Sequence, residues 1–289
     1  MDASDVCKNL IDGVVVINLD SSSDRLKTFM ERTGAQFPAG KVERISAVLG
    51  RALPGYGETP WFTEKTGERA RFWGGTAGCA LSHQKAIRHA KKQGWKNVLI
   101  FEDDACLLQK PGMWDLIAKA LTKADGRYLF YLGYNKPVPF GRRWLKGENL
   151  DVWKVNGLLT THAYLVPASM YDLLLRFLPT EETVWEWLSI YKAVDVLYRD
   201  FIPLQPGVSI YAVYPVLCVQ GDQFSEIAQK ASDGGELMCN RPPYSIFSPK
   251  AISRVWCPWM QAIKNKLNSR RTHRRALKGG LPGYRKPKS

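Results

Sequence analysis

Three adjacent carboxylates, Glu102-Asp103-Asp104, follow an apolar run and are the residues of this sequence with the clearest chemical potential. In an extended chain, Glu102 and Asp104 point to one side and Asp103 to the other. Carboxylates grouped in this way repel one another unless a positive charge lies among them. Two on one side could hold Mg²⁺ or Mn²⁺, hard cations that take oxygen ligands and also bind substrate phosphates. A solvated acidic turn that caps the following helix is the alternative interpretation.

A second candidate pair is formed by Cys79 and His83, which lie four residues apart and therefore on one face of a predicted helix. A thiol beside a histidine could act as a nucleophile. The alternative is a small buried cysteine beneath a polar histidine. The sequence contains no Gly-x-Gly-x-x-Gly, Gly-x-x-x-x-Gly-Lys, Gly-x-Ser-x-Gly or His-Glu-x-x-His motif. With six cysteines, four histidines and no Cys-x-x-Cys, the sequence lacks zinc-ligand spacing and predicts reduced thiols.

The elements that must position these side chains alternate between strands and helices. A β-branched run at Val14–Leu19 predicts a buried strand that leads into a helix at Asp24–Thr33, and Asn97–Phe101 predicts a second buried strand. Further strands are expected at 128–132 and 163–166, and further helices at 76–93, 113–124, 168–178 and 185–200. This order predicts an α/β fold with a mainly parallel sheet. Ligands bind beyond the carboxyl ends of such strands, which directs attention to residues 18–20 and 102–104.

Residues 50–75 are rich in glycine and proline and are expected to form a long loop that ends where Thr76 caps the next helix. Long ordered loops in a domain of this size are often functional lids.

Charge divides the chain into two parts. The sequence has 289 residues and a net charge of +14, which by itself would suggest a nucleic-acid binder. Residues 237–289, however, hold 13 of the 41 basic residues and no Asp or Glu, which leaves 28 basic against all 27 acidic residues in the remainder. We therefore expect a catalytic domain at 1–236 and a basic, partly amphipathic extension at 237–289.

The extension has three interpretations. Trp256, Trp259, Met260 and Ile263 could enter a lipid interface while the arginine pairs meet anionic headgroups, which would make the protein peripheral at a membrane. Alternatively, the extension binds nucleic acid or another polyanion, which we consider the weaker interpretation, or it is a solvated tail.

Composition sets the broad class of the protein. At 45% hydrophobic and 24% charged residues the sequence is that of an ordinary globular protein and excludes wholesale disorder. No apolar run approaches the roughly 20 residues of a spanning helix, and the first residues are acidic rather than typical of a signal peptide. A cytoplasmic protein is expected.

Several motifs together, in order along the chain, resemble glycosyltransferase family 25, the lipopolysaccharide-biosynthesis and procollagen galactosyltransferase type. The matching segments are Val16–Asp20 with Asp24-Arg25, Gly78–Ala86 with its Gly-Cys-x-x-Ser-His pattern, Val98–Asp104, Thr161–Val166, Val194-Asp195, and Tyr214–Gln220 with Phe224–Ile227. The resemblance covers about residues 13–228. Glu226 stands where the family usually has Asp, and the segments before Gly78 and after Asp195 depart from its pattern.

The resemblance implies a GT-A-like nucleotide-sugar-binding fold and inverting transfer of a sugar, often galactose from UDP-galactose, to a glycan, lipopolysaccharide, lipid-linked or protein acceptor. Donor binding would fall to Asn18, Asp24 and Arg25. Glu102 and Asp104 would hold Mn²⁺ or Mg²⁺ against the diphosphate.

The remaining site residues are also assigned through the resemblance. Asp103 would turn toward sugar hydroxyls or helix amides, and His162 would contact donor or acceptor unless it is a core histidine. Asp195 is the first candidate for the base that an inverting transfer needs, and His83 is the second. Weaker candidates are Gln220, Ser225 and the loop aromatics Trp61, Phe62, Phe72 and Trp73, which could stack on a sugar ring or pack the loop down. An inactive relative that binds a nucleotide sugar, and a polyanion-binding protein that acts through the tail, are the competing functions.

Overall fold

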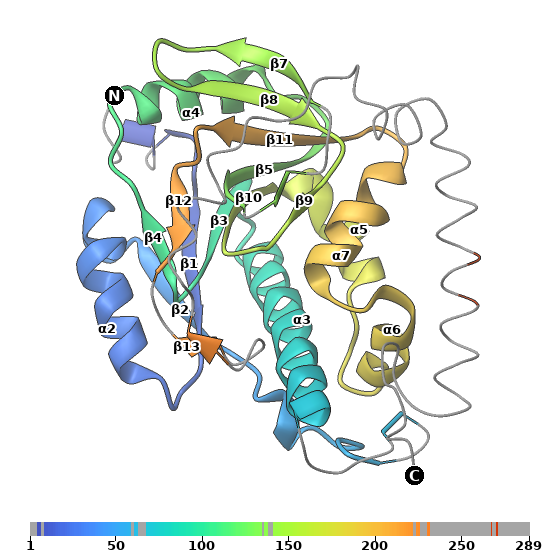
Figure 1. Cartoon of the computed structure of the whole chain (residues 1–289). Helices are drawn as coiled ribbons and strands as arrows, with labels where there is room; N and C mark the ends of the chain where they lie inside the picture. The colour runs from blue at the N-terminus through green and yellow to red at the C-terminus, as the bar shows by residue number, and fades with distance from the viewer. Residues whose placement is uncertain are drawn as a thin grey trace.

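A single eight-stranded sheet forms the centre of the computed structural model (Figure 1). Its strands are β1 (Gly13–Asn18), β2 (Val42–Ser46), β3 (Asn97–Glu102), β5 (Arg127–Gly133), β7 (Gly141–Lys146), β8 (Asp151–Val155), β10 (Ala163–Pro167) and β11 (Val208–Tyr214). Their order across the sheet is β2-β1-β3-β10-β5-β11-β8-β7. The structure describes residues 5–6, 9–58, 61–62, 68–134, 136–137, 141–221, 224–225, 230–231, 267 and 270.

Most strands of this sheet run in one direction. Parallel pairs join β1 to β2, β1 to β3, and β11 to β5. Strand β10 is antiparallel to both of its neighbours, β3 and β5, and β8 is antiparallel to β11 and β7. The prediction of an α/β fold with a mainly parallel sheet is therefore confirmed.

Helices cover both faces of the sheet. They are α2 (Ser23–Arg32), α3 (Glu68–Lys92), α4 (Met113–Lys123), α5 (Ala168–Phe177), α6 (Val184–Tyr191) and α7 (Val194–Asp200). Because successive side chains of a strand face opposite ways, Val15 and Ile100 pack under α3, α5, α6 and α7, whereas Val14 and Leu99 pack under α2 and α4. Burial on both faces explains the uninterrupted apolar strands.

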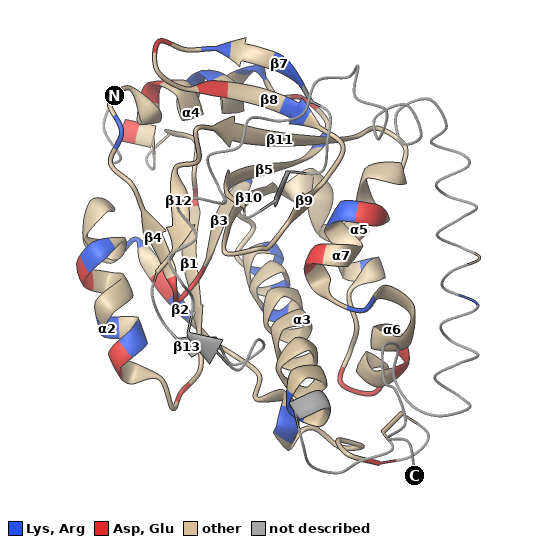
Figure 2. Ribbon diagram, in the orientation of Figure 1, with Lys and Arg blue, Asp and Glu red and all other residues tan. Residues whose placement is uncertain are grey.

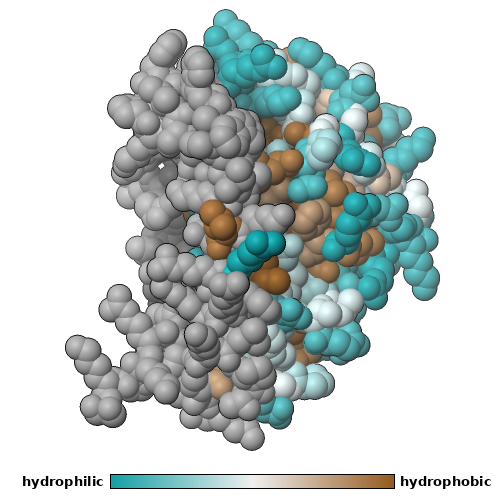
Figure 3. All heavy atoms as spheres, turned by 90° about the vertical axis from the view of Figure 1, so that its right-hand side faces the viewer, coloured by the Kyte–Doolittle hydropathy of each residue, from teal (hydrophilic) through white to brown (hydrophobic). Residues whose placement is uncertain are grey.

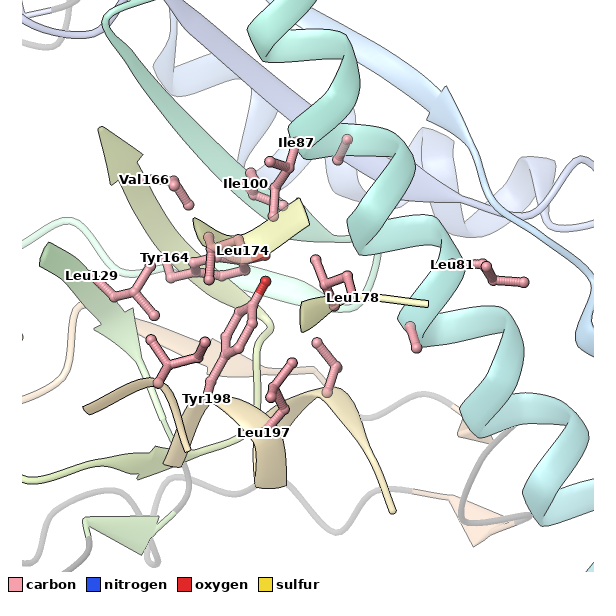
Figure 4. Close-up of a cluster of buried hydrophobic side chains, with 14 of the residues drawn as sticks. Leu81, Ile87, Ile100, Leu129, Tyr164, Val166, Leu174, Leu178, Leu197 and Tyr198 are labelled. Atoms are coloured by element: carbon pink, nitrogen blue, oxygen red, sulfur yellow. The ribbon is translucent and has the colours of Figure 1, made fainter. Parts of the chain in front are cut away.

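The core beneath α3 is rich in aromatic and aliphatic side chains. Figure 4 shows Ile87 of α3 next to Ile100 of β3, with Tyr164 of β10 and Tyr198 of α7 below them in the view and Leu81 further along α3. The rings of Tyr164 and Tyr198 meet edge to face, with centroids 5.7 Å apart. This packing fixes the inner face of α3, which also carries the candidate residues Cys79 and His83.

Helix α3 begins earlier than the sequence analysis expected. It starts at Glu68, so the predicted loop at residues 50–75 is wrong over its last eight residues, and Thr76 is not a cap but donates its hydroxyl to the Phe72 carbonyl inside the helix. Gly74 lies within the helix and faces a 3₁₀ turn, η2 (Gly50–Ala52). The close approach of this turn explains why the helix has a glycine there. A Cβ on Gly74 would come within 2.9 Å of the Tyr56 ring. Because glycine has no side chain, the turn can lie directly against the helix.

A second correction concerns the helix predicted at 185–200. The structure has two helices there, α6 and α7, which are separated at Lys192. Lys192 adopts a φ of 70°, a left-handed conformation that ends a right-handed helix. The new helix start puts Asp195 in the first turn of α7.

Gly78 is a position in α3 where the helix comes close to the backbone of η2 and of the residues before it. A Cβ there would lie 2.3 Å from the Val48 carbonyl oxygen and 2.9 Å from the Gly50 amide nitrogen, and both are backbone atoms. We expect Gly78→Ala to lower the free energy of unfolding by about 1–3 kcal/mol, because backbone must move to admit the methyl group. Urea denaturation measures this change. Arg88→Ala, at an exposed position on α3, is the matched control. Equal unfolding midpoints for the two variants would contradict the close approach.

Among the described residues no helix is long and apolar enough to cross a bilayer. On the face shown in Figure 3, the described surface mixes hydrophilic and hydrophobic side chains. The basic extension at 237–289 lies outside the described residues, apart from Leu267 and Arg270, as does Glu226.

Candidate functional site

A cavity of about 180 Å³ opens at the carboxyl ends of β1 and β3. The chain leaves β1 through α2 on one face of the sheet and returns through α3 on the other, so the strands on either side of β1 are reached in opposite directions. Such a point is where α/β sheets bind ligands. The acidic triplet lines the cavity together with Asn18 and Arg25, and Figure 2 shows these acidic residues where β3 turns toward β4 (Ala105–Leu107).

Asp103 is held by its neighbours rather than turned toward a substrate. Its carboxylate accepts a hydrogen bond from Asn18 Nδ2 at 2.7 Å and forms an ion pair with Arg25 of α2. Burial raises the pKa of Asp103, although Arg25 and Asn18 work against this rise. Asp103 thus ties β1, α2 and the end of β3 together while it also lines the cavity. Its expected contact with sugar hydroxyls or helix amides stays a prediction.

Asn18 and Arg25 both line the cavity, and donor binding by these two residues stays a prediction. Asn18 also donates to the Ser22 carbonyl and accepts from Arg44 Nε at 3.0 Å. Asp24, in contrast, is exposed in the first turn of α2 and is not among the residues that line the cavity.

Glu102 lies at the end of β3 and is fixed by two donors. Thr161 Oγ1 donates to its Oε1 at 2.8 Å, and His83 Nε2 lies 3.3 Å from the same oxygen. Burial would raise the pKa of Glu102, but the hydrogen bonds and charge of His83, with Thr161, outweigh it and hold the pKa below its ordinary value. Because His83 Nδ1 is 2.8 Å from the Tyr164 hydroxyl, both ring nitrogens are engaged. His83 is thereby suited to positioning Glu102 rather than to taking a proton.

Asp104 has the environment that best fits a cation ligand. Its Oδ1 is buried with no hydrogen-bond partner among the described residues, whereas its Oδ2 accepts from Gln220 Nε2 at 3.2 Å and lies 3.9 Å from Arg25. Burial and the nearby charge of Glu102 raise the pKa of Asp104 to about 7. A buried carboxylate oxygen without a donor is costly unless a cation or proton satisfies it. The residues present therefore fit a divalent cation of the Mg²⁺ or Mn²⁺ type.

Asp195 lies beside the cavity rather than in its lining. Its Oδ2 accepts from the Thr160 amide at 3.3 Å, and Thr160 itself has a φ of 70°. Such a conformation in a non-glycine residue is strained and clusters at functional sites. Burial raises the pKa of Asp195, and the nearby negative charge of Glu102 adds to this rise. The charge of Asp195 in turn contributes to the raised pKa of the buried Cys79 thiol.

His162 is a core histidine. It is fully buried, with Nδ1 3.0 Å from Thr160 Oγ1 and Nε2 3.3 Å from the Cys218 carbonyl oxygen. Burial lowers its pKa. It does not line the cavity, so the structure gives it the packing role that the sequence left as an alternative.

The four loop aromatics also pack inward instead of facing the cavity. Phe62 and Trp73 are buried, and Trp61 and Phe72 are partly buried against the same core. The Phe62 ring meets Trp185 of α6 edge to face, with centroids 4.9 Å apart. Ser225 lies in a described segment whose side chains are not described.

Several residues that matter here were not singled out from the sequence. Arg51 of η2 and Arg71 of α3 line the cavity, but no sequence signal marked them because their segment was interpreted as a loop. Tyr164 and Thr161, which hold His83 and Glu102, lie in the matched Thr-His-Ala-Tyr segment. Their place in that matched segment is the signal that could have found them.

The comparison with protein families agrees with this geometry. Residues 11–135 match the family described as glycosyltransferase family 25 (LPS biosynthesis protein), and this match includes β1, α3 and the acidic triplet. The resemblance to that family predicted from the sequence is thereby confirmed over residues 11–135, and with it the expectation of a glycosyltransferase. No curated protein matches the chain.

Solved structures with a distant likeness include a mannose-1-phosphate geranyltransferase from Thermus thermophilus. It is 12% identical, covers 69% of this chain and 73% of its own, and has a TM-score of 0.36. A second is a glycosyltransferase involved in the glycosylation of the major capsid of PBCV-1, with 10% identity, coverage of 68% and 80%, and a TM-score of 0.35.

Proposed function

We propose, from the premise that this chain is a glycosyltransferase with the family 25 sequence at residues 11–135, that it transfers a sugar from a UDP-sugar to an acceptor hydroxyl with inversion. The observation that carries the proposal is the buried oxygen of Asp104, which has no hydrogen-bond partner in the described part of the chain and lies in a cavity at the carboxyl ends of β1 and β3. Galactose is the favoured sugar, because it is the one that the resemblance implies.

Glu102 and Asp104 would hold Mn²⁺ or Mg²⁺. A bound divalent cation neutralises the negative charge that develops on a diphosphate leaving group. His83 and Thr161 hold the Glu102 carboxylate in place and favour its ionised form. Asp104 must lose its proton to serve as a ligand, so its raised pKa predicts that donor turnover falls as the pH drops below about 7.

Arg25 and Asn18 form the donor side of the cavity. Asp103 fixes the Arg25 guanidinium at the cavity wall, where it can donate hydrogen bonds to phosphate or base. The exposed side chains of Arg51 and Arg71 add positive charge on the side formed by η2 and α3. This distribution suits a ligand with several negative oxygens.

Asp195 is the proposed general base. An inverting transfer needs a group that takes the proton of the attacking hydroxyl, and a carboxyl whose pKa is raised by burial does so more effectively at neutral pH. His83 is less suited to this role because Tyr164 and Glu102 engage both of its nitrogens.

The acceptor is proposed to be a glycan hydroxyl, with a lipopolysaccharide precursor favoured over a protein because the matching family is described as one of LPS biosynthesis. A lipid-linked acceptor would agree with peripheral attachment through the basic extension, which stays a prediction.

Hydrolysis of the donor tests the proposal without knowledge of the acceptor. Purified full-length protein is incubated with a panel of UDP-sugars, with and without Mn²⁺, and release of UDP is followed. We expect Mn²⁺-dependent release from one donor. If no donor releases UDP and UDP itself does not bind in a Mn²⁺-dependent manner, the proposal is refuted and an inactive relative or a polyanion-binding protein takes its place.

A further inference from the structure

A second group of potential metal ligands lies on the α3 wall of the cavity. Cys79, His83 and Glu102 each offer a ligand atom, and these three atoms lie within 4.8 Å of one another. All three residues line the cavity, which gives an ion a path of entry. The set combines sulfur, nitrogen and oxygen, unlike the all-oxygen pair Glu102 and Asp104.

Two features of the fold bring these residues together. Cys79 and His83 are separated by one turn of α3, so both side chains project from the same helix face. Glu102 is the last residue of β3, and its Oε1 lies 3.3 Å from His83 Nε2. The arrangement therefore rests on a long helix and a central strand rather than on a loop, and such elements hold ligands accurately.

His83 has a hydrogen-bond partner on the ring nitrogen that would not bind the metal, as metal-binding histidines do. His83 Nδ1 lies 2.8 Å from the hydroxyl of the buried Tyr164, which fixes the plane of the ring and leaves Nε2 directed at Glu102. Histidines that bind a metal almost always donate a hydrogen bond from their second ring nitrogen to a neighbouring group.

We propose that Cys79, His83 and Glu102 form a binding site for a thiolate-preferring divalent cation such as Zn²⁺. Three protein ligands with a fourth position open to the cavity are the arrangement of an accessible zinc site. The ligand atoms of a tetrahedral zinc ion lie about 3.5 Å apart, given bond lengths of about 2.0–2.3 Å. The spacing between Glu102 and His83 already meets this requirement, and the thiol needs only a small inward movement.

The site shares Glu102 with the proposed Mn²⁺ site, and this has a functional consequence. If Glu102 binds Zn²⁺ together with His83, it can no longer bind the Mn²⁺ that Asp104 would hold. We therefore expect Zn²⁺ to inhibit donor turnover by competition with Mn²⁺. Binding of Zn²⁺ does not depend on the proposed function, but this inhibition does.

Cobalt absorption tests the site without any measurement of sugar transfer. Co²⁺ replaces Zn²⁺ in such sites, and a thiolate ligand gives an intense charge-transfer band in the near ultraviolet. Co²⁺ is titrated into full-length, reduced protein. We expect a single Co²⁺ to produce this band in the wild type, and excess Zn²⁺ to abolish it.

Matched variants identify the ligands. Cys79→Ala and Cys79→Ser should both lose the band, and Zn²⁺ affinity should fall about tenfold or more. Cys106→Ala should keep the band, because Cys106 is a free thiol outside the cluster. Asp104→Asn should also keep it, which separates this site from the Mn²⁺ site. Thermal melts in EDTA verify that each variant is folded.

Absence of the band in the wild type, or its persistence in a folded Cys79 variant, would overturn the proposal. Either result leaves Mn²⁺-dependent donor hydrolysis untouched as a measurement, so failure of the zinc site and failure of the transferase proposal are distinguishable.

Discussion

Asp104→Asn is expected to abolish Mn²⁺-dependent UDP release, with a loss on the order of 10²–10³-fold or more in rate. The substitution preserves the size of the side chain and its contact with Gln220 but removes the charge that would hold the cation. Binding of UDP in the presence of Mn²⁺, measured by calorimetry, should be weakened in parallel. Asp172→Asn, an exposed change on α5, is the control and should match the wild type. Full activity in Asp104→Asn would exclude Asp104 as a ligand.

The same variant makes a prediction about stability without metal. Because the pKa of Asp104 is raised to about 7 by burial and by Glu102, its proton stabilises the fold at low pH, and this contribution is lost as the pH rises through 7. Between about pH 4 and about pH 7, the free energy of unfolding of the wild type in EDTA should therefore fall relative to that of Asp104→Asn. At about pH 8, Mn²⁺ should raise the melting temperature of the wild type and not that of the variant.

Asp195→Asn is the second substitution with a large expected effect, and it should separate binding from chemistry. Loss of a general base lowers the rate by about 10²–10⁴-fold. Hydrolysis of the donor, in which water takes the place of the acceptor, should fall by this factor. Affinity for UDP with Mn²⁺ should stay at the wild-type level, because Asp195 is not among the residues that line the cavity.

The control for Asp195→Asn is Asp200→Asn on the same helix, where the carboxylate pairs with Arg199. Its donor hydrolysis should equal that of the wild type. A rate for Asp195→Asn within a factor of two of this control would remove Asp195 from the chemistry. The activity that then remained would point to a water chain or another carboxylate as the base.

The sequence predicted the fold well where apolar runs were long and buried on both faces. β1, β3 and β5 lie where expected, because a strand under helices on both sides needs apolar residues at every position. Glycines misled the prediction at α3, since Gly74 is required there for close approach of Tyr56 and η2, a tertiary contact that local propensity does not record. The helix break at Lys192 likewise has no sequence signal.

The candidate site was predicted in part. The acidic triplet, Asn18 and Arg25 meet at the cavity because strand ends were identifiable from the sequence. The sequence could not tell whether His162 and the loop aromatics bind a ligand or pack in the core, since histidine and aromatic residues occur in both places. Arg71 was missed because the first turns of α3 were interpreted as a loop.

Hydrogen bonds between main-chain atoms hold the segment that follows the acidic triplet. Strand β4 pairs with β12 (Cys218–Gln220), the Gly221 amide donates to the Asp104 carbonyl, and the Leu217 amide donates to the Leu132 carbonyl. Side chains can change along such a strand without loss of these bonds. The family pattern can thus fade beyond residue 135 while the geometry around the triplet persists. Substitutions in β12 that keep the backbone in place would then leave the position of the acidic triplet unchanged.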